Sequence, residues 1–129
     1  MTAPRLILIV EDNPRNLKLV RDVLEHTGYA TLAADRAEVG LELARKRGPD
    51  LVLMDVQLPG MDGVEALGRL RADPATAAMP VVAVTAFAME ADRTRLLAAG
   101  FDDYIEKPIS VRELPRRVAA LIGSPAQAR

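Results

Sequence analysis

The alternation of short apolar runs with longer amphipathic stretches constrains the fold of this chain more than any other feature. Runs such as 6–10 and 51–54 are apolar at every position and rich in branched side chains, which is typical of strands buried on both faces of a parallel sheet. Between the runs, apolar residues recur at helical spacing. Five strands alternating with five helices predict βαβ units with right-handed crossovers, hence a parallel sheet with helices on both faces.

The expected boundaries follow from caps and breakers. Asn13 and Pro14 are typical of a helix start, and Gly28 of its end. Pro115 lies too far inside the last helix if that helix begins at Ser110, so we expect the helix to start late or to bend. Strands are expected at 6–10, 29–33, 51–54, 80–84 and 103–106, and helices at 14–27, 36–47, 64 to about 73, 89–99 and 110–122.

Length and composition exclude several classes of function. A chain of 129 residues fits one domain, for which we expect a core over about 5–122 and a frayed tail over 123–129. The formal charge of −1 and the presence of only two Tyr and two Phe argue against direct binding of nucleic acid. The absence of cysteine excludes disulfides and thiolate zinc sites. The apolar run at 6–10 is too short for a signal peptide or a membrane span, so we expect a cytoplasmic protein without membrane insertion.

Polar side chains stand at or just after the carboxyl ends of four expected strands. They are Glu11 with Asp12, then Asp55, Thr85 and Lys107. Ligands of open parallel sheets bind outside these strand ends. Three converging carboxylates repel one another, and an all-oxygen ligand set favours a hard cation such as Mg²⁺, with Mn²⁺ as an alternative. Thr85 and Lys107 suit two oxygens of a phosphoryl group, and Asp55 suits its nucleophilic acceptor.

This ordered set resembles the receiver domain of two-component response regulators. The loop at 59–63, the segment 102–104 and the Lys107-Pro108 pair belong to the same resemblance, which covers about residues 5–122. It implies a flavodoxin-like, doubly wound α/β sandwich of three layers, with five parallel strands in the order 2-1-3-4-5 and five helices.

The resemblance also implies roles for individual residues. Asp55 is the expected phosphoacceptor, which takes a phosphoryl group from a phosphohistidine on a sensor histidine kinase or a histidine phosphotransfer protein. Asp12, Asp55 and the backbone carbonyl of Gln57 are the expected Mg²⁺ ligands, and Glu11 is expected to act through water. Thr85 is expected to hydrogen-bond one phosphoryl oxygen.

The same family pattern implies a switch near the end of the chain. Lys107 is expected to pair with a second phosphoryl oxygen, aimed by a cis peptide bond before Pro108. Tyr104 is expected to turn inward when Thr85 moves toward the phosphoryl group, which changes the surface formed by 89–99, 103–106 and 110–122 and so its contacts with a downstream protein. A weak homodimer through that surface is a further expectation, against which Pro115 argues. The bulky Phe87 offers nothing to orient an attacking water, so we expect slow hydrolysis.

The leading interpretation is therefore a stand-alone receiver, which is a signalling module and catalyses only its own phosphorylation and dephosphorylation. One alternative is a receiver fragment of a larger regulator or hybrid kinase. A second is a metal-dependent phosphatase with an aspartyl-phosphate intermediate, against which stand the lack of an insertion to cover a small substrate and the presence of Gln57 where a second aspartate is needed. A flavodoxin-like binding protein is disfavoured, because Glu11 and Asp12 repel a ligand phosphate after the first strand.

Overall fold

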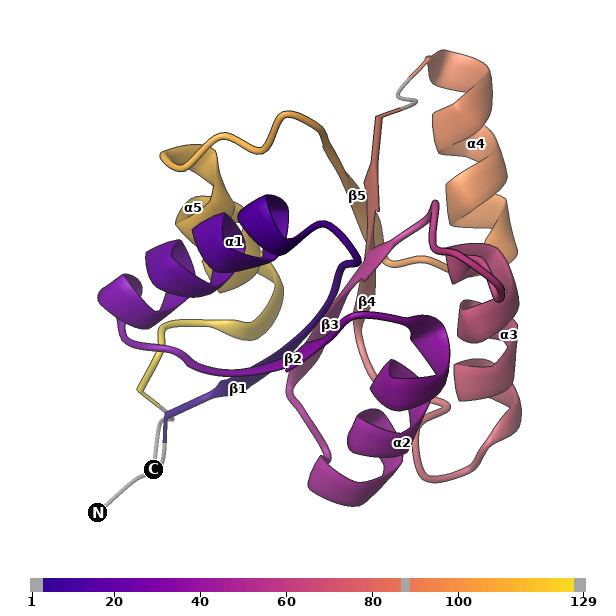
Figure 1. Ribbon diagram of the computed structural model, residues 1–129, viewed down its shortest axis with the longest axis horizontal. Coiled ribbons are helices and arrows are strands. Elements are labelled where there is room, and N and C mark those ends of the chain that lie inside the picture. Colours follow the sequence, from indigo (N-terminus) through magenta and orange to yellow (C-terminus); the bar gives the residue numbers. More distant parts are fainter. Residues whose placement is uncertain (1–3, 87–88, 127–129) are drawn as a thin grey trace.

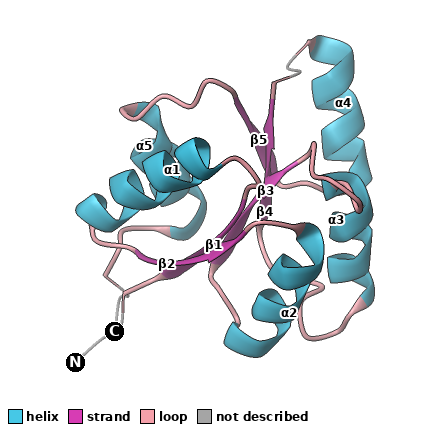
Figure 2. Ribbon diagram, viewed as in Figure 1, coloured by secondary structure: helices cyan, strands magenta, loops and turns pink. Residues whose placement is uncertain are grey.

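A parallel sheet of five strands, in the order β2-β1-β3-β4-β5, forms the middle layer of the protein. The computed structural model describes residues 4–86 and 89–126. Helices α1 and α5 cover one face of the sheet, and α2, α3 and α4 cover the other (Figures 1 and 2). The strands are β1 (Leu6–Val10), β2 (Ala30–Ala34), β3 (Leu51–Asp55), β4 (Val81–Thr85) and β5 (Asp103–Glu106). The helices are α1 (Pro14–Thr27), α2 (Ala37–Arg47), α3 (Gly63–Ala72), α4 (Glu90–Ala99) and α5 (Glu113–Ile122).

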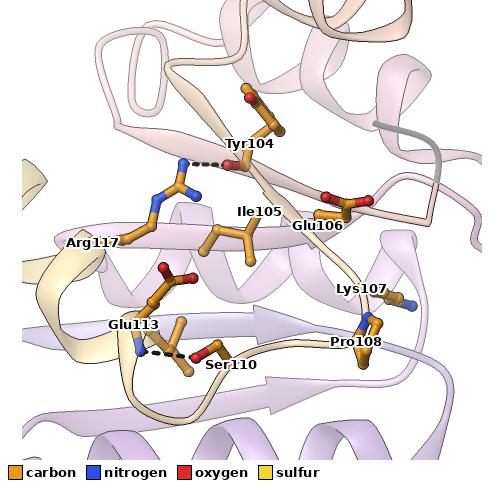
Figure 3. Close-up of a pocket in the computed structure, with 9 residues that line it drawn as sticks. Tyr104, Ile105, Glu106, Lys107, Pro108, Ser110, Glu113 and Arg117 are labelled. Atoms are coloured by element: carbon orange, nitrogen blue, oxygen red, sulfur yellow. Dashed lines mark hydrogen bonds between the residues drawn. The ribbon is translucent and has the colours of Figure 1, made fainter. Parts of the chain in front are cut away.

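The strand order and the layers confirm the predicted fold, and the boundaries differ by a few residues at most. Arg36 is the N-cap of α2 and not its first residue. The last helix starts late, at Glu113, because Pro115 then lies in the first turn, where its missing N–H has no helical partner. Ser110 stands before the helix and its hydroxyl accepts from the Glu113 N–H at 3.2 Å, as Figure 3 shows.

The core lies on both faces of the sheet. Successive side chains of a strand point to opposite faces, so Leu8 and Val10 of β1 pack in one apolar cluster and Ile7 and Ile9 in the other. All four are at most 2% exposed. This burial explains why the strands are apolar at every position. No helix in the described part of the chain has the length and apolar character needed to cross a bilayer.

The start of α3 packs directly against the end of β3. The Gly63 N–H donates to the Val56 carbonyl at 3.0 Å. A Cβ atom at Gly63 would lie 2.6 Å from the carbonyl oxygen of Asp55 and 2.8 Å from the Cα of Val56. The close approach requires glycine at this position. It also fixes the loop that follows Asp55 against the end of the strand.

The two ends of the described chain pair with each other at the edge of the sheet where β1 begins. The Arg5 N–H donates to the Pro125 carbonyl at 2.7 Å, and the Arg5 Nε donates to the Ser124 carbonyl at 3.0 Å. The Tyr29 hydroxyl donates to the Gly123 carbonyl at 2.7 Å. Residues 123–125, which were expected to fray, thus have hydrogen-bond partners in Arg5, just before β1, and in Tyr29, just before β2. Residues 127–129 lie outside the described part.

Candidate metal centre

Three carboxylates gather at the carboxyl edge of the sheet. Glu11 and Asp12 follow β1, and Asp55 is the last residue of β3. One carboxylate oxygen of each lies within 4.8 Å of the other two. Glu11 and Asp55 are 4% and 3% exposed, whereas Asp12 is exposed to solvent. The adjacency of β1 and β3 in the sheet brings together residues separated by more than forty positions along the chain.

Lys107 lies between the two buried carboxylates. Its Nζ is 2.9 Å from Asp55 Oδ2 and 3.1 Å from Glu11 Oε1. Its backbone N–H donates to the carbonyl of Thr85 at 2.8 Å, which fixes the residue beside the end of β4. The peptide bond between Lys107 and Pro108 is cis, as predicted. The lysine therefore lies at the site through both its backbone and its side chain.

Backbone donors orient the other oxygens of the buried carboxylates. The Gln57 N–H donates to Asp55 Oδ1 at 2.9 Å. The Asn13 N–H donates to Glu11 Oε2 at 3.1 Å, and the Asn13 side chain in turn caps α1. Each donor lies two residues after the carboxylate that it contacts, so the turns leaving β1 and β3 serve the same purpose.

The charges of the cluster act strongly on one another. Burial, together with the hydrogen bond and the negative charge of Asp55, raises the pKa of Glu11 to about 7, against the opposing effect of the Asn13 N–H and Lys107. Burial acts to lower the pKa of Lys107, but the hydrogen bonds and charges of Asp55 and then Glu11 outweigh it, so its pKa lies above the usual value. The site thus carries more negative than positive charge.

The donor set fits a hard divalent cation. The ligand atoms on offer are carboxylate oxygens, which Mg²⁺ and Mn²⁺ prefer over softer donors. Asp12 is open to solvent, so a cation that keeps several water ligands has room beside it. A bound divalent cation also relieves the repulsion between carboxylates that one lysine leaves partly uncompensated.

Thr85 and Tyr104 lie on the neighbouring strands β4 and β5. Thr85 ends β4, is 2% exposed and pairs in register with Glu106 of β5. The ring of Tyr104, on the edge strand, lies 4.9 Å from the guanidinium carbon of Arg93 and 5.7 Å from that of Arg117. Phe87 lies outside the described residues.

Most of the predicted site residues are therefore neighbours in the structure, and Tyr104 is the exception. Glu11, Asp12, Asp55 and Lys107 form one cluster, to which the Gln57 N–H is joined. Tyr104 is separate from this cluster and contacts Arg93 and Arg117, neither of which was expected from the sequence. No local motif marks them, since Arg93 lies on α4 and Arg117 on α5.

Comparisons with known proteins agree with this geometry. The family model described as "Response regulator receiver domain" matches residues 7–119. Two polar-differentiation response regulators named DivK are similar over nearly their full length. The one from Brucella anthropi is 43% identical over 93% of this chain and 98% of the relative. The one from Brucella ovis is 44% identical over 91% of this chain and 95% of the relative.

Solved structures show the same likeness. The receiver domain of a sensor histidine kinase from Pseudomonas aeruginosa, with a magnesium ion coordinated in its active-site cleft, superposes with a TM-score of 0.86 at 36% identity and covers 95% of this chain and 100% of that one. A Francisella response regulator receiver domain gives a TM-score of 0.85 at 27% identity, over 92% and 96% of the two chains. From its sequence, its strand order and its acidic cluster, this chain belongs to the response regulator receiver domain family.

Proposed function

We propose that this receiver domain accepts a phosphoryl group on Asp55 in a two-component phosphorelay and signals through the resulting change in its surface. The observation that carries the proposal is the setting of one buried carboxylate. Asp55 is held by the Gln57 N–H and by Lys107 and lies within a three-carboxylate cluster. A structural aspartate needs neither the two other carboxylates nor the lysine.

The proposed donor is a phosphohistidine of a sensor histidine kinase or a histidine phosphotransfer protein. A carboxylate oxygen of Asp55 attacks the phosphorus, an O–P bond forms, and the P–N bond to the imidazole breaks. The imidazole keeps the electron pair of that bond and takes up a proton. In the later hydrolysis, the oxygen of a water molecule attacks the phosphorus and the P–O bond to Asp55 breaks, which gives inorganic phosphate and restores the carboxylate.

The surrounding residues suit this transfer. Asp12 and Asp55, with the carbonyl of Gln57 and with Glu11 through water, are the proposed ligands of Mg²⁺, which supplies positive charge beside the transferred group. The Lys107 ammonium and the Thr85 hydroxyl are the proposed partners of phosphoryl oxygens. The relative from Pseudomonas aeruginosa, whose cleft holds magnesium, supports the choice of this ion.

The proposed output is a change in the surface of α4, β5 and α5, driven by Thr85 and Tyr104. A hollow of about 440 Å³ lies between β5 and α5 on this surface. Tyr104, Lys107 and Arg117 are among its lining residues (Figure 3). Because Lys107 contacts both the hollow and Asp55, a change at the acceptor reaches a surface on which a downstream protein can bind. We further propose that the whole chain forms one domain and turns over no small-molecule substrate.

The test is phosphorylation by a small donor. We expect intact mass spectrometry to show one added phosphoryl group after incubation with acetyl phosphate and Mg²⁺, and none after removal of Mg²⁺ with a chelator. Asp55→Asn is expected to abolish the adduct, whereas Asp50→Asn, whose carboxylate accepts from the Leu6 N–H at the opposite edge of the sheet, is expected to keep it. An adduct of equal yield on Asp55→Asn, or no adduct and no released phosphate with the unaltered protein, would refute the proposal.

Mg²⁺ is expected to stabilise the unphosphorylated domain. A ligand that binds the folded state alone adds about 2.7 kcal/mol at one hundred times its dissociation constant, so the melting temperature should rise with Mg²⁺ concentration. Asp12→Asn removes one proposed ligand at an exposed position and is expected to remove most of this rise. Asp22→Asn, on the exposed surface of α1, serves as the matched control. A rise that is equal in both variants would contradict the proposed ligand set.

A further inference from the structure

Helix α4 has few apolar contacts with the rest of the domain. Among its ten residues, Leu96 is the one buried side chain. Leu97 is 47% exposed, and Met89, the N-cap, is 75% exposed. At the carboxyl end, the carbonyl of the C-cap Gly100 accepts from Arg71 at 3.0 Å. The carboxyl half of α4 is therefore held by the buried Leu96 and by the bond to Arg71. The amino half has no buried side chain, so a different contact must hold it.

The amino half of α4 contacts the ring of Tyr104. Arg93 is the fourth residue of α4. Its guanidinium carbon lies 4.9 Å from the centroid of that ring. Arg93 is itself exposed, and in the described part of the chain it forms no ion pair with a carboxylate. A guanidinium at this distance from an aromatic ring is attracted by the negative charge of the ring face.

The ring in turn is held from the side of α5. Arg117 lies 5.7 Å from the ring centroid, and its NH2 donates to Asp103 Oδ1 at 3.0 Å and to the Tyr104 carbonyl at 2.5 Å. Figure 3 shows Arg117 reaching this carbonyl on the edge strand. Arg117 is thus fixed by three groups of β5, whereas the ring is the one partner that the guanidinium of Arg93 has among the described residues.

We propose that Arg93 is a positioning residue through which the rotamer of Tyr104 controls how firmly α4 is held. While the ring lies under Arg93, it ties the amino half of α4 to β5 and α5. When the ring moves, the contact with Arg93 is lost and α4 unfolds locally more often. This inference rests on the proposed function in one respect, namely that phosphorylation of Asp55 is what moves the ring.

Amide hydrogen exchange of residues 94–99, whose N–H groups lie in the helical bonds of α4, measures the tie directly. In the unphosphorylated protein, Arg93→Gln is expected to speed this exchange about two- to five-fold, the factor that corresponds to an exposed cation–π contact. Arg93→Lys keeps a cation and is expected to restore slow exchange. Arg95→Gln makes the same substitution on the same helix away from the ring, and it is expected to leave the rate unchanged within about 1.5-fold.

Variants at position 104 show whether the effect passes through the ring. Tyr104→Phe keeps an aromatic face, so Arg93→Gln should still speed exchange in that background. Tyr104→Leu removes the face and should by itself speed exchange of residues 94–99, and Arg93→Gln should then add nothing. An equal effect of Arg93→Gln with Tyr104 and with Tyr104→Leu would overturn the inference, because Arg93 would then act through helix propensity alone.

The phosphorylated protein tests the link to Asp55. With acetyl phosphate and Mg²⁺, exchange in α4 of the unaltered protein is expected to approach that of Arg93→Gln, and the difference between the two should fall within about 1.5-fold. A difference that persists in fully phosphorylated protein would refute the coupling and leave a static tie. The absence of any adduct by mass would refute the proposed function and the coupling together. The contact between Arg93 and Tyr104 is tested separately, by the exchange rates of the unphosphorylated variants.

Discussion

Replacing Gly63 with alanine is expected to lower the free energy of unfolding by about 3 kcal/mol, at the upper end of what overpacking costs. The added Cβ would lie 2.6 Å from the Asp55 carbonyl oxygen and 2.8 Å from the Cα of Val56. Both are backbone atoms, which cannot rotate away, so β3 and α3 must separate. Thermal unfolding should show a melting temperature lower by about 10 °C for a domain of this size.

Gly68→Ala on the same helix is the matched control. Among the described residues, no atom beyond its chain neighbours and the backbone of its own helix lies within 4 Å of a Cβ built at Gly68, and the position is exposed. Because glycine is a poor residue in a helix interior, this variant is expected to gain about 0.5–1 kcal/mol. The two substitutions should therefore change stability in opposite directions. A Gly63→Ala protein as stable as the unaltered one would show that α3 does not press against Asp55.

Replacing Lys107 with methionine is expected to slow phosphorylation by acetyl phosphate about 100-fold, the usual loss when a preorganised charge at a reacting group is removed. Methionine has a similar length but no charge, so the phosphoryl group loses a cationic partner. The same change removes a positive charge that stands 2.9 Å from Asp55 Oδ2. Mg²⁺ binding, measured by calorimetry, is therefore expected to stay equal or to tighten.

Slower phosphorylation without weaker Mg²⁺ binding would distinguish a chemical role of Lys107 from a structural one. If Lys107 merely held the fold of the site together, both quantities would fall. Lys46→Met removes another lysine whose Nζ lies 2.8 Å from a carboxylate, Glu42 Oε1, on the exposed surface of α2. It is expected to change neither the rate of adduct formation nor Mg²⁺ binding.

Much of the fold is predictable from the sequence because its signals are local and agree with one another. The Asn13 cap, the Gly28 end and the buried strands at 6–10 and 51–55 each follow from a short stretch of residues. The convergence of Glu11, Asp12 and Asp55 also follows, since parallel strands end at a common edge. The late start of α5 follows from the chemistry of Pro115.

What the sequence did not predict depends on side chains that meet from distant elements. The contacts of Arg93 and Arg117 with Tyr104 join α4, α5 and β5, and no spacing along the chain signals them. The pairing of Arg5 with residues 124 and 125 is of the same kind, since it joins the two ends. A tail of small residues is expected to fray from its composition, because composition carries no information about a distant partner such as Arg5, just before the first strand.

That pairing has a practical consequence for the design of reporters. Pro4 and Ala126, the two ends of the described chain, form an isolated antiparallel bridge. Figure 1 shows this edge of the sheet, where β1 begins, away from the ends of β1 and β3 where the carboxylates lie. A fluorescent protein or affinity handle joined to Pro4 or Ala126 would therefore begin at the edge of the sheet opposite Asp55. A short peptide linker between positions 4 and 126, with new termini opened in the loop at 73–79, would yield a circular permutant whose acceptor edge is untouched.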